Sequence, residues 1–217
     1  MKKLTIFLVF LLFAGFSLNA RISWEFEIKG NVGYNFVNEE TPFGNQQYKD
    51  FLFGAGLDVT LCFGHFIGLN LSGSYLPICY TNPNPTENNL NIDFRSGMRL
   101  GQGLAIMIPI TEKVKVKTVV GYSLMIYNRY NETCEDEYGN EQNVPNKYEA
   151  GGFFASLGCV WMPVKHFGLT FGTDIDFNIA EGRKRQFSQS GYEYNPKYTQ
   201  IYINPFMGGV IRLGRKL

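Results

Sequence analysis

Beyond its first 20 residues, this chain of 217 residues contains no run of about 18 apolar residues, the length that a membrane-spanning helix needs. Its net charge is +1, so no overall positive field points to nucleic acid as a partner. It has 4 cysteines without a C-x-x-C pair and 2 histidines, so no metal or other cofactor is expected. By contrast, 24 glycines and 16% aromatic residues are not typical of a disordered chain.

The N-terminus has the order of a secretion signal. Two lysines follow Met1, residues Leu4 to Leu18 are almost all apolar, and the small residue Ala20 follows shortly after them. The apolar stretch is too short to span a bilayer comfortably as a helix. We therefore expect cleavage after Ala20, which leaves a single domain over residues 21–217, and an uncleaved anchor helix is the alternative.

A two-residue alternation of apolar and small or polar side chains recurs along the rest of the chain. From Phe51 to Phe63 every second residue is apolar, and glycines, Asp58, Thr60 and Cys62 stand between them. This period places the two sets on opposite faces of a β-strand. Eight segments share the pattern: Trp24–Val37, Lys49–Phe63, Phe66–Tyr80, Leu90–Ile108, Lys113–Asn128, Tyr148–Met162, Phe167–Ile179 and Thr199–Arg215.

The connections between these segments alternate in length. Short turns are expected at residues 64–65, 109–112 and 163–166, and the other connections are longer: Asn38–Tyr48, Thr81–Asn89, Arg129–Lys147 and Ala180–Tyr198. Trp24 and Trp161 fall at strand ends on the short-turn side, where an aromatic girdle belongs. The sequence therefore predicts an all-β fold, an eight-stranded antiparallel up-and-down transmembrane β-barrel with both chain ends on the short-turn side.

The size of the side chains on each face predicts which face points inward. Most of the strand glycines lie on the polar face, whereas the other face carries phenylalanine, leucine and isoleucine. An eight-stranded barrel is only just wide enough inside for side chains, so the small residues are expected inside. A convex apolar surface suits lipid and would aggregate in water. A soluble lipocalin-type barrel would have the opposite arrangement.

The polar face also carries charges of both signs, which inside a narrow barrel must pair because unpaired buried charge is costly. We expect a core closed by salt bridges, with a charge-lined conducting pore as the alternative. The predicted interior charges are Glu25, Glu27, Lys29, Asp58, Asp93, Arg95, Arg99, Lys115, Lys117, Asp174, Asp176 and Arg212.

The long-loop side carries the other candidate sites. Cys79 and Cys134 are both expected there, which leaves open a disulfide between them or four unbridged cysteines. The third long loop is acidic and the fourth is basic, so they form either a binding surface or two solvated loops that attract each other. The candidate binding residues are Glu132, Glu135, Asp136, Glu137, Arg183, Lys184 and Arg185.

Both histidines, His65 and His166, fall in predicted short turns. Some small outer-membrane barrels modify lipid A with a histidine and a serine, but they act at the outer leaflet, which is the opposite end of this barrel. Neither histidine has an obvious carboxylate neighbour in the sequence. We therefore interpret both as interfacial turn residues, and catalysis is the alternative.

On its signal, strand count, loop alternation and aromatic girdle, the chain resembles the small eight-stranded outer-membrane β-barrel superfamily, which includes the outer-membrane protein A-type and X-type barrels. The resemblance implies a bacterial outer-membrane location among lipid and lipopolysaccharide, and insertion by the barrel assembly machinery. It also implies a non-enzymatic role in envelope structure or in adhesion to a host or surface ligand. A narrow porin-like channel for small solutes and a lipid A-modifying enzyme are the alternatives. Pro205 departs from a regular last strand and predicts a bulge or break.

Overall fold

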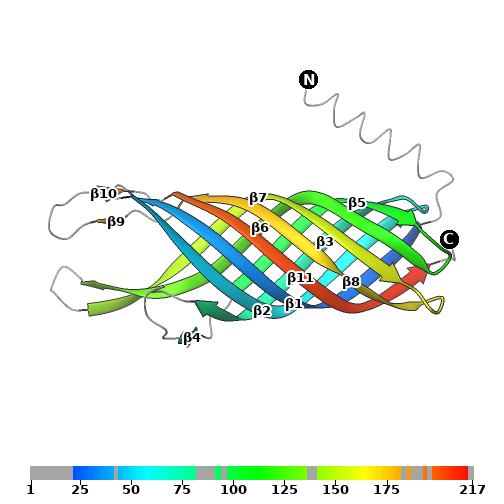
Figure 1. Ribbon diagram of the computed structural model, residues 1–217, viewed down its shortest axis with the longest axis horizontal. Helices are drawn as coiled ribbons and strands as arrows, with labels where there is room; N and C mark the ends of the chain where they lie inside the picture. The colour runs from blue at the N-terminus through cyan, green and yellow to red at the C-terminus, as the bar shows by residue number, and fades with distance from the viewer. Residues whose placement is uncertain are drawn as a thin grey trace, which may run out of the picture.

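The computed structural model describes residues 22–41, 44–81, 91–93, 97–135, 141–181, 185–186, 193–194 and 197–214. Eight long strands close into one antiparallel barrel, because β1 pairs with both β2 and β11 (Figure 1). The long strands are β1 (Ile22–Thr41), β2 (Gly44–Phe63), β3 (Ile67–Thr81), β5 (Gly97–Pro109), β6 (Val114–Glu135), β7 (Glu141–Trp161), β8 (Phe167–Glu181) and β11 (Lys197–Gly214). The predicted fold class is confirmed.

Three short strands lie at the long-loop end. β4 (Asn91–Asp93) pairs with the outer part of β3, and β9 (Arg185–Gln186) pairs with β10 (Glu193–Tyr194). The predicted run Leu90–Ile108 is therefore two strands, β4 and β5, and residues 94–96 between them are outside the described part of the chain. No helix among the described residues is long and apolar enough to cross a membrane.

The order of the strands and the three short turns are as predicted, but two long connections are wrong in extent. β1 and β2 pair as far as Thr41 and Gly44, where a loop over Asn38–Tyr48 was expected. β6 and β7 pair as far as Glu135 and Glu141, inside the predicted loop Arg129–Lys147. Both segments are polar on each face, so they lack the alternation that reveals a strand with one apolar side.

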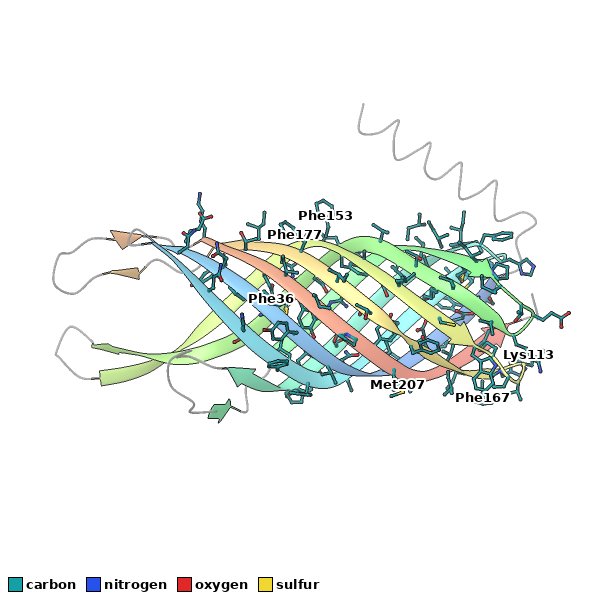
Figure 2. All side chains as sticks on the ribbon, in the orientation of Figure 1. Phe36, Lys113, Phe153, Phe167, Phe177 and Met207 are labelled. Atoms are coloured by element: carbon teal, nitrogen blue, oxygen red, sulfur yellow. The ribbon has the colours of Figure 1, made fainter. Side chains whose placement is uncertain are left out.

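The predicted assignment of the two faces is confirmed. Along β5, buried and exposed residues alternate through most of the strand. Figure 2 shows Phe153, Phe177 and Met207 projecting from the outer surface, and Phe153 and Met207 are each 74% exposed. Trp24 and Trp161 lie on the same surface at the short-turn end, each 44% exposed. The outside of the barrel is thus the continuous apolar surface that a membrane requires.

Of the bulge or break predicted at Pro205, the structure has a break in one of the two ladders. Pro205 pairs with Thr173 of β8 in unbroken register. On its other side the ladder to β1 skips Val32 and Gly33 and then resumes in the same register. Proline has no backbone N–H to contribute to a ladder, so the pairing is interrupted there without a change of register.

Candidate functional site in the barrel interior

The short-turn half of the interior begins with one carboxylate shared by two cations, here called the lower cluster. Glu25 of β1 is 0% exposed. Lys115 of β6 donates from Nζ to its Oε2 at 2.6 Å. Arg212 of β11 donates to its Oε1 at 2.8 Å from Nε and lies 2.7 Å away through Nη2. Three strands are thus joined by charge-assisted hydrogen bonds.

The middle of the barrel holds a balanced set of charges, here called the middle cluster. Lys117 of β6 donates to Glu27 of β1. Lys29 donates to Asp58 of β2 at 2.6 Å and lies 3.8 Å from Glu27. The ammonium group of Lys29 also stands 3.7 Å from the ring centre of Phe206, which is a cation–π contact. Two cations here meet two carboxylates.

Nearer the long-loop end lies the upper cluster, in which one cation faces two carboxylates. Arg99 of β5 is 1% exposed, and its Nε donates to the carboxylate of Asp176 at 2.9 and 3.0 Å. Its Nη1 lies 3.7 Å from Asp174, and its guanidinium carbon is 5.0 Å from the ring centre of Phe154. The Nη2 atom has no hydrogen-bond partner among the described residues. Asp174 is also contacted by Asn204.

These clusters together hold as many cations as carboxylates, but the charges are unevenly placed. The lower cluster has an excess of one positive charge, and the upper cluster has an excess of one negative charge. Buried charges are costly unless they are paired and hydrogen-bonded, and each of these carboxylates lies within ion-pair distance of a cation. The three clusters are therefore compensated as a group and polarised along the barrel axis.

Beyond the upper cluster, amide and apolar side chains fill the interior together, and the side chain of Asp50, beside Asn35, is also buried there. Gln200 donates to Asn35 at 2.7 Å and accepts from Asn178 at 3.2 Å, which links three strands. The ring of Tyr202 covers Gly33 so closely that an added Cβ would lie 2.1 Å from the phenol oxygen. Around it is the apolar cap, a cluster of side chains that are at most 4% exposed: Val37, Leu52, Leu76, Met125, Ala150, Tyr198 and Tyr202.

The twelve charges predicted for the polar face have different outcomes. Ten lie in the lower, middle and upper clusters, nine of them buried and Arg212 half-buried. Arg95 and the side chain of Asp93 lie outside the described residues. Opposite charges that are far apart in the sequence are thus brought together by barrel closure, as in the 90-residue separation of Glu25 and Lys115.

The loop and cysteine predictions fall mostly on residues that the structure does not describe. Cys62 and Cys159 are free thiols, and the side chains of Cys79 and Cys134 are outside the described set, so their disulfide stays a prediction. Glu132 and Glu135 belong to β6 and not to a loop, and Arg185 belongs to β9, with side chains that are not described. Outside the described residues are Asp136, Glu137, Arg183 and Lys184.

The two histidines lie at the short-turn end. His65 is exposed. His166 donates from Nδ1 to the carbonyl oxygen of Arg212 at 3.0 Å, and the Arg212 amide donates to the carbonyl oxygen of His166 at 2.9 Å. His166 therefore fastens the end of β11 to the β7–β8 turn. The described residues contain no group of three or more His, Cys, Asp or Glu side chains that could hold a metal.

The sequence analysis missed the buried Asp50 and the amide and apolar side chains of the interior. Leu52 of the apolar cap shares its strand face with Asp50 and Asp58, because the three are separated by even numbers of residues. Phe154 and Phe206, which lie against Arg99 and Lys29, are likewise inward-facing. The two-residue period places these residues on the inner face. They were missed because every large apolar residue was assigned to the lipid face by its type alone.

The sequence matches no protein-family model and no curated protein. Among solved structures, the barrel is similar to outer membrane protein OprG from Pseudomonas aeruginosa, with a TM-score of 0.62, 9% identity, and coverage of 90% of this chain and 98% of that one. The barrel is also similar to outer membrane protein AlkL, solved in DMPC lipid bilayers, with a TM-score of 0.60, 7% identity, and coverage of 91% of this chain and 93% of that one. The outer membrane protease OmpT from Escherichia coli has a lower TM-score of 0.42, with 8% identity and coverage of 89% of this chain and 97% of that one. The chain has the fold of the OprG and AlkL barrels, and a fold does not specify an activity.

Proposed function

We propose that this chain is a non-enzymatic, sealed barrel of a bacterial outer membrane, and that it displays hairpins and loops at the cell surface for envelope structure or ligand binding. In this proposal residues 1–20 are the export signal, and the barrel assembly machinery inserts the rest of the chain. The fold shared with OprG and AlkL and the apolar outer surface support the membrane location. The short-turn end then faces the periplasm.

The observation that carries this proposal is the filled interior. From the periplasmic end, a solute meets the lower, middle and upper clusters in turn, and then the apolar cap. An eight-stranded barrel has room inside for side chains and little else. At the level of the cap, the buried side chain of Gln200 packs against Met125, so amide and apolar groups fill the interior together. Paired charges followed by tightly packed amide and apolar side chains therefore favour a scaffold over a pore.

We expect the protein to give no resolvable conductance steps in a planar lipid bilayer. Insertion is checked beforehand by the heat-dependent shift of the folded band on a gel and by β-rich circular dichroism. The pore alternative predicts stable steps, and it predicts that Arg99→Gln changes their ion selectivity, because Arg99 lies in the narrow interior. Steps that respond to this substitution would replace the sealed scaffold by a channel.

The longest hairpin extends beyond the barrel wall. β5 accompanies β6 up to Tyr127, and β8 accompanies β7 as far as Gly151. Further out β6 and β7 pair with each other, so residues 128–135 and 141–147 form a two-stranded ribbon, here called the surface ribbon (Figure 1). Its sequence includes Glu132 and Glu135. A projecting segment on a rigid scaffold is well placed to contact another surface.

Trimming the surface ribbon should remove surface binding and leave the barrel intact. Asn128 and Lys147 are register partners, so residues 129–146 can be replaced by a two-residue Asn-Gly turn of the kind that closes hairpins. We expect the trimmed protein to keep its heat-dependent gel shift. Adhesion of cells that express it to cultured host-cell monolayers should fall to the level of cells without the protein.

The β1–β2 hairpin offers a matched control, because it also has register partners near its end. Asn38 pairs with Gln47, so residues 39–46 can be replaced in the same way. This variant should adhere like the full-length chain. Undiminished adhesion after trimming of the surface ribbon would show that the ribbon is not the binding surface.

The fourth long connection offers a second candidate surface, for lipopolysaccharide. Its sequence places Arg183, Lys184 and Arg185 in succession, and Arg185 is the first residue of β9. Arginine binds phosphate through paired hydrogen bonds, and lysine binds it as a point charge. Lipopolysaccharide phosphates are therefore the partner that this segment fits by chemistry. Catalysis on lipid A is less well supported, because His65 and His166 both lie at the periplasmic end.

A further inference from the structure

The periplasmic mouth of the barrel contains a cavity of about 620 Å³, here called the vestibule. It is bordered by the β5–β6 turn, the β7–β8 turn, His65 of the β2–β3 turn and the end of β11. Its size lies within the usual range for sites that hold small molecules, about 300–1,000 Å³. The vestibule is distinct from the surface ribbon, which lies at the opposite end of the barrel (Figure 1).

Most of the charged side chains that line the vestibule are cationic, whereas many of its other lining residues are apolar. Lys113 and Lys165 are exposed on its rim, and Figure 2 shows Lys113 at this end of the barrel. Lys115 and Arg212 lie deeper, with side chains that are 11% and 18% exposed. Among the residues that line the vestibule, Glu112 is the one carboxylate.

The buried charges beneath the vestibule do not cancel this positive character. Lys115 and Arg212 share Glu25, whose side chain is 0% exposed. The cations therefore stand between the cavity and the carboxylate, and one of their two charges is left without a carboxylate in the lower cluster. With Lys113 and Lys165 on the rim, the vestibule presents more positive than negative charge.

The two turns that carry the rim lysines are held in place by hydrogen bonds. Thr111 Oγ1 accepts from the backbone amides of Lys113 at 3.2 Å and Val114 at 3.0 Å. The amide of Met162 donates to the carbonyl oxygen of Lys113 at 2.7 Å, which joins the β5–β6 turn to the β7–β8 turn. The reciprocal pair between His166 and Arg212 joins the second turn to β11. The cations thus surround a formed cavity, which lowers the cost of binding.

We propose that the vestibule binds an oxyanion of the phosphate class, held by Lys113 and Lys165 at the rim and by Lys115 and Arg212 at the floor. A phosphate group offers several oxygens, so it can accept charge-assisted hydrogen bonds from more than one cation at once. The group can come from a free periplasmic phosphate or from the headgroup of an inner-leaflet phospholipid. This proposal is independent of any ligand at the cell-surface end.

The first experiment tests whether the vestibule binds free phosphate. The full-length, detergent-folded protein is titrated calorimetrically with inorganic phosphate at constant ionic strength. The rim variant Lys113→Gln/Lys165→Gln removes two exposed charges from turns and leaves the lower cluster intact. We expect it to bind phosphate about tenfold more weakly, a change of about 1.4 kcal/mol. The matched control Lys49→Gln/Lys197→Gln removes two exposed charges at the opposite end and should bind like the wild type.

The lipid source is tested by native mass spectrometry of protein extracted from vesicles of equal phosphatidylglycerol and phosphatidylcholine. Saturable phosphate binding that weakens in the rim variant and not in the control supports a free oxyanion. Selective retention of phosphatidylglycerol that the rim variant loses, without phosphate binding, supports the lipid headgroup. If neither ligand binds, or if the rim and control variants bind alike, the proposal is overturned. The gel shift confirms that each variant is folded.

Discussion

Replacement of Arg99 by methionine should lower the free energy of unfolding by about 3–5 kcal/mol. Arg99 is the cation that pairs with both Asp176 and Asp174, which are 0% and 5% exposed. Methionine fills a similar volume, so most of the loss comes from two buried carboxylates that lose their partner. Such a loss is a large fraction of the stability of a typical domain.

Urea titration of the barrel in lipid vesicles, followed by tryptophan fluorescence, measures this effect. The variant Arg99→Met/Asp174→Asn/Asp176→Asn removes all three charges and should regain much of the lost stability, because no carboxylate stays buried alone. Lys197→Met, an exposed cation at the end of β11, controls for the loss of a positive charge. If Arg99→Met is as stable as the wild type, the two carboxylates are solvated, and a water-filled pore becomes the better interpretation.

Replacement of Leu157 by arginine should cost about 2–4 kcal/mol in a bilayer. Leu157 of β7 lies on the outer surface with 62% of its side chain exposed. Trp161, four residues closer to the turn, marks the interface. With a strand rise of about 3.3 Å and a tilt of about 40°, Leu157 lies about 10 Å deeper, close to the middle of the apolar band.

The depth of the substitution is the test of the membrane location. Arginine at Trp161 should cost about 0–1 kcal/mol, because that position reaches the interface. Leu157→Met controls for the altered shape and should change little. Urea unfolding in vesicles measures all three variants. A soluble barrel would show no depth dependence, since both positions would face water.

The faces and order of the strands could be predicted because the lipid and the narrow interior each impose a residue type. That constraint ends where the barrel leaves the membrane. In the surface ribbon both faces are polar, so Glu132 and Glu135 read as loop residues although they belong to β6. The extent of a strand that projects into water is set by its partner strand, which a local pattern does not contain.

The pairing of the interior charges could not be predicted for a related reason. The two-residue period shows that Glu25, Lys115 and Arg212 point inward, but it does not give their heights along the barrel axis. The heights depend on the register of every strand pair and on the tilt that closes the barrel. Arg99 and Asp176 meet across 77 residues of sequence only after all those registers are set.

The seam between β1 and β11 determines when the barrel can be completed. The first and last strands lie side by side along most of their length, so the wall stays open until the end of the chain has been synthesised. Until then β1 carries an unpaired edge, which is prone to pair with other chains. Glu25 also lacks the guanidinium group of Arg212 during that interval. Contacts so distant in sequence form slowly, and the newly synthesised chain needs protection from aggregation until its first and last strands pair.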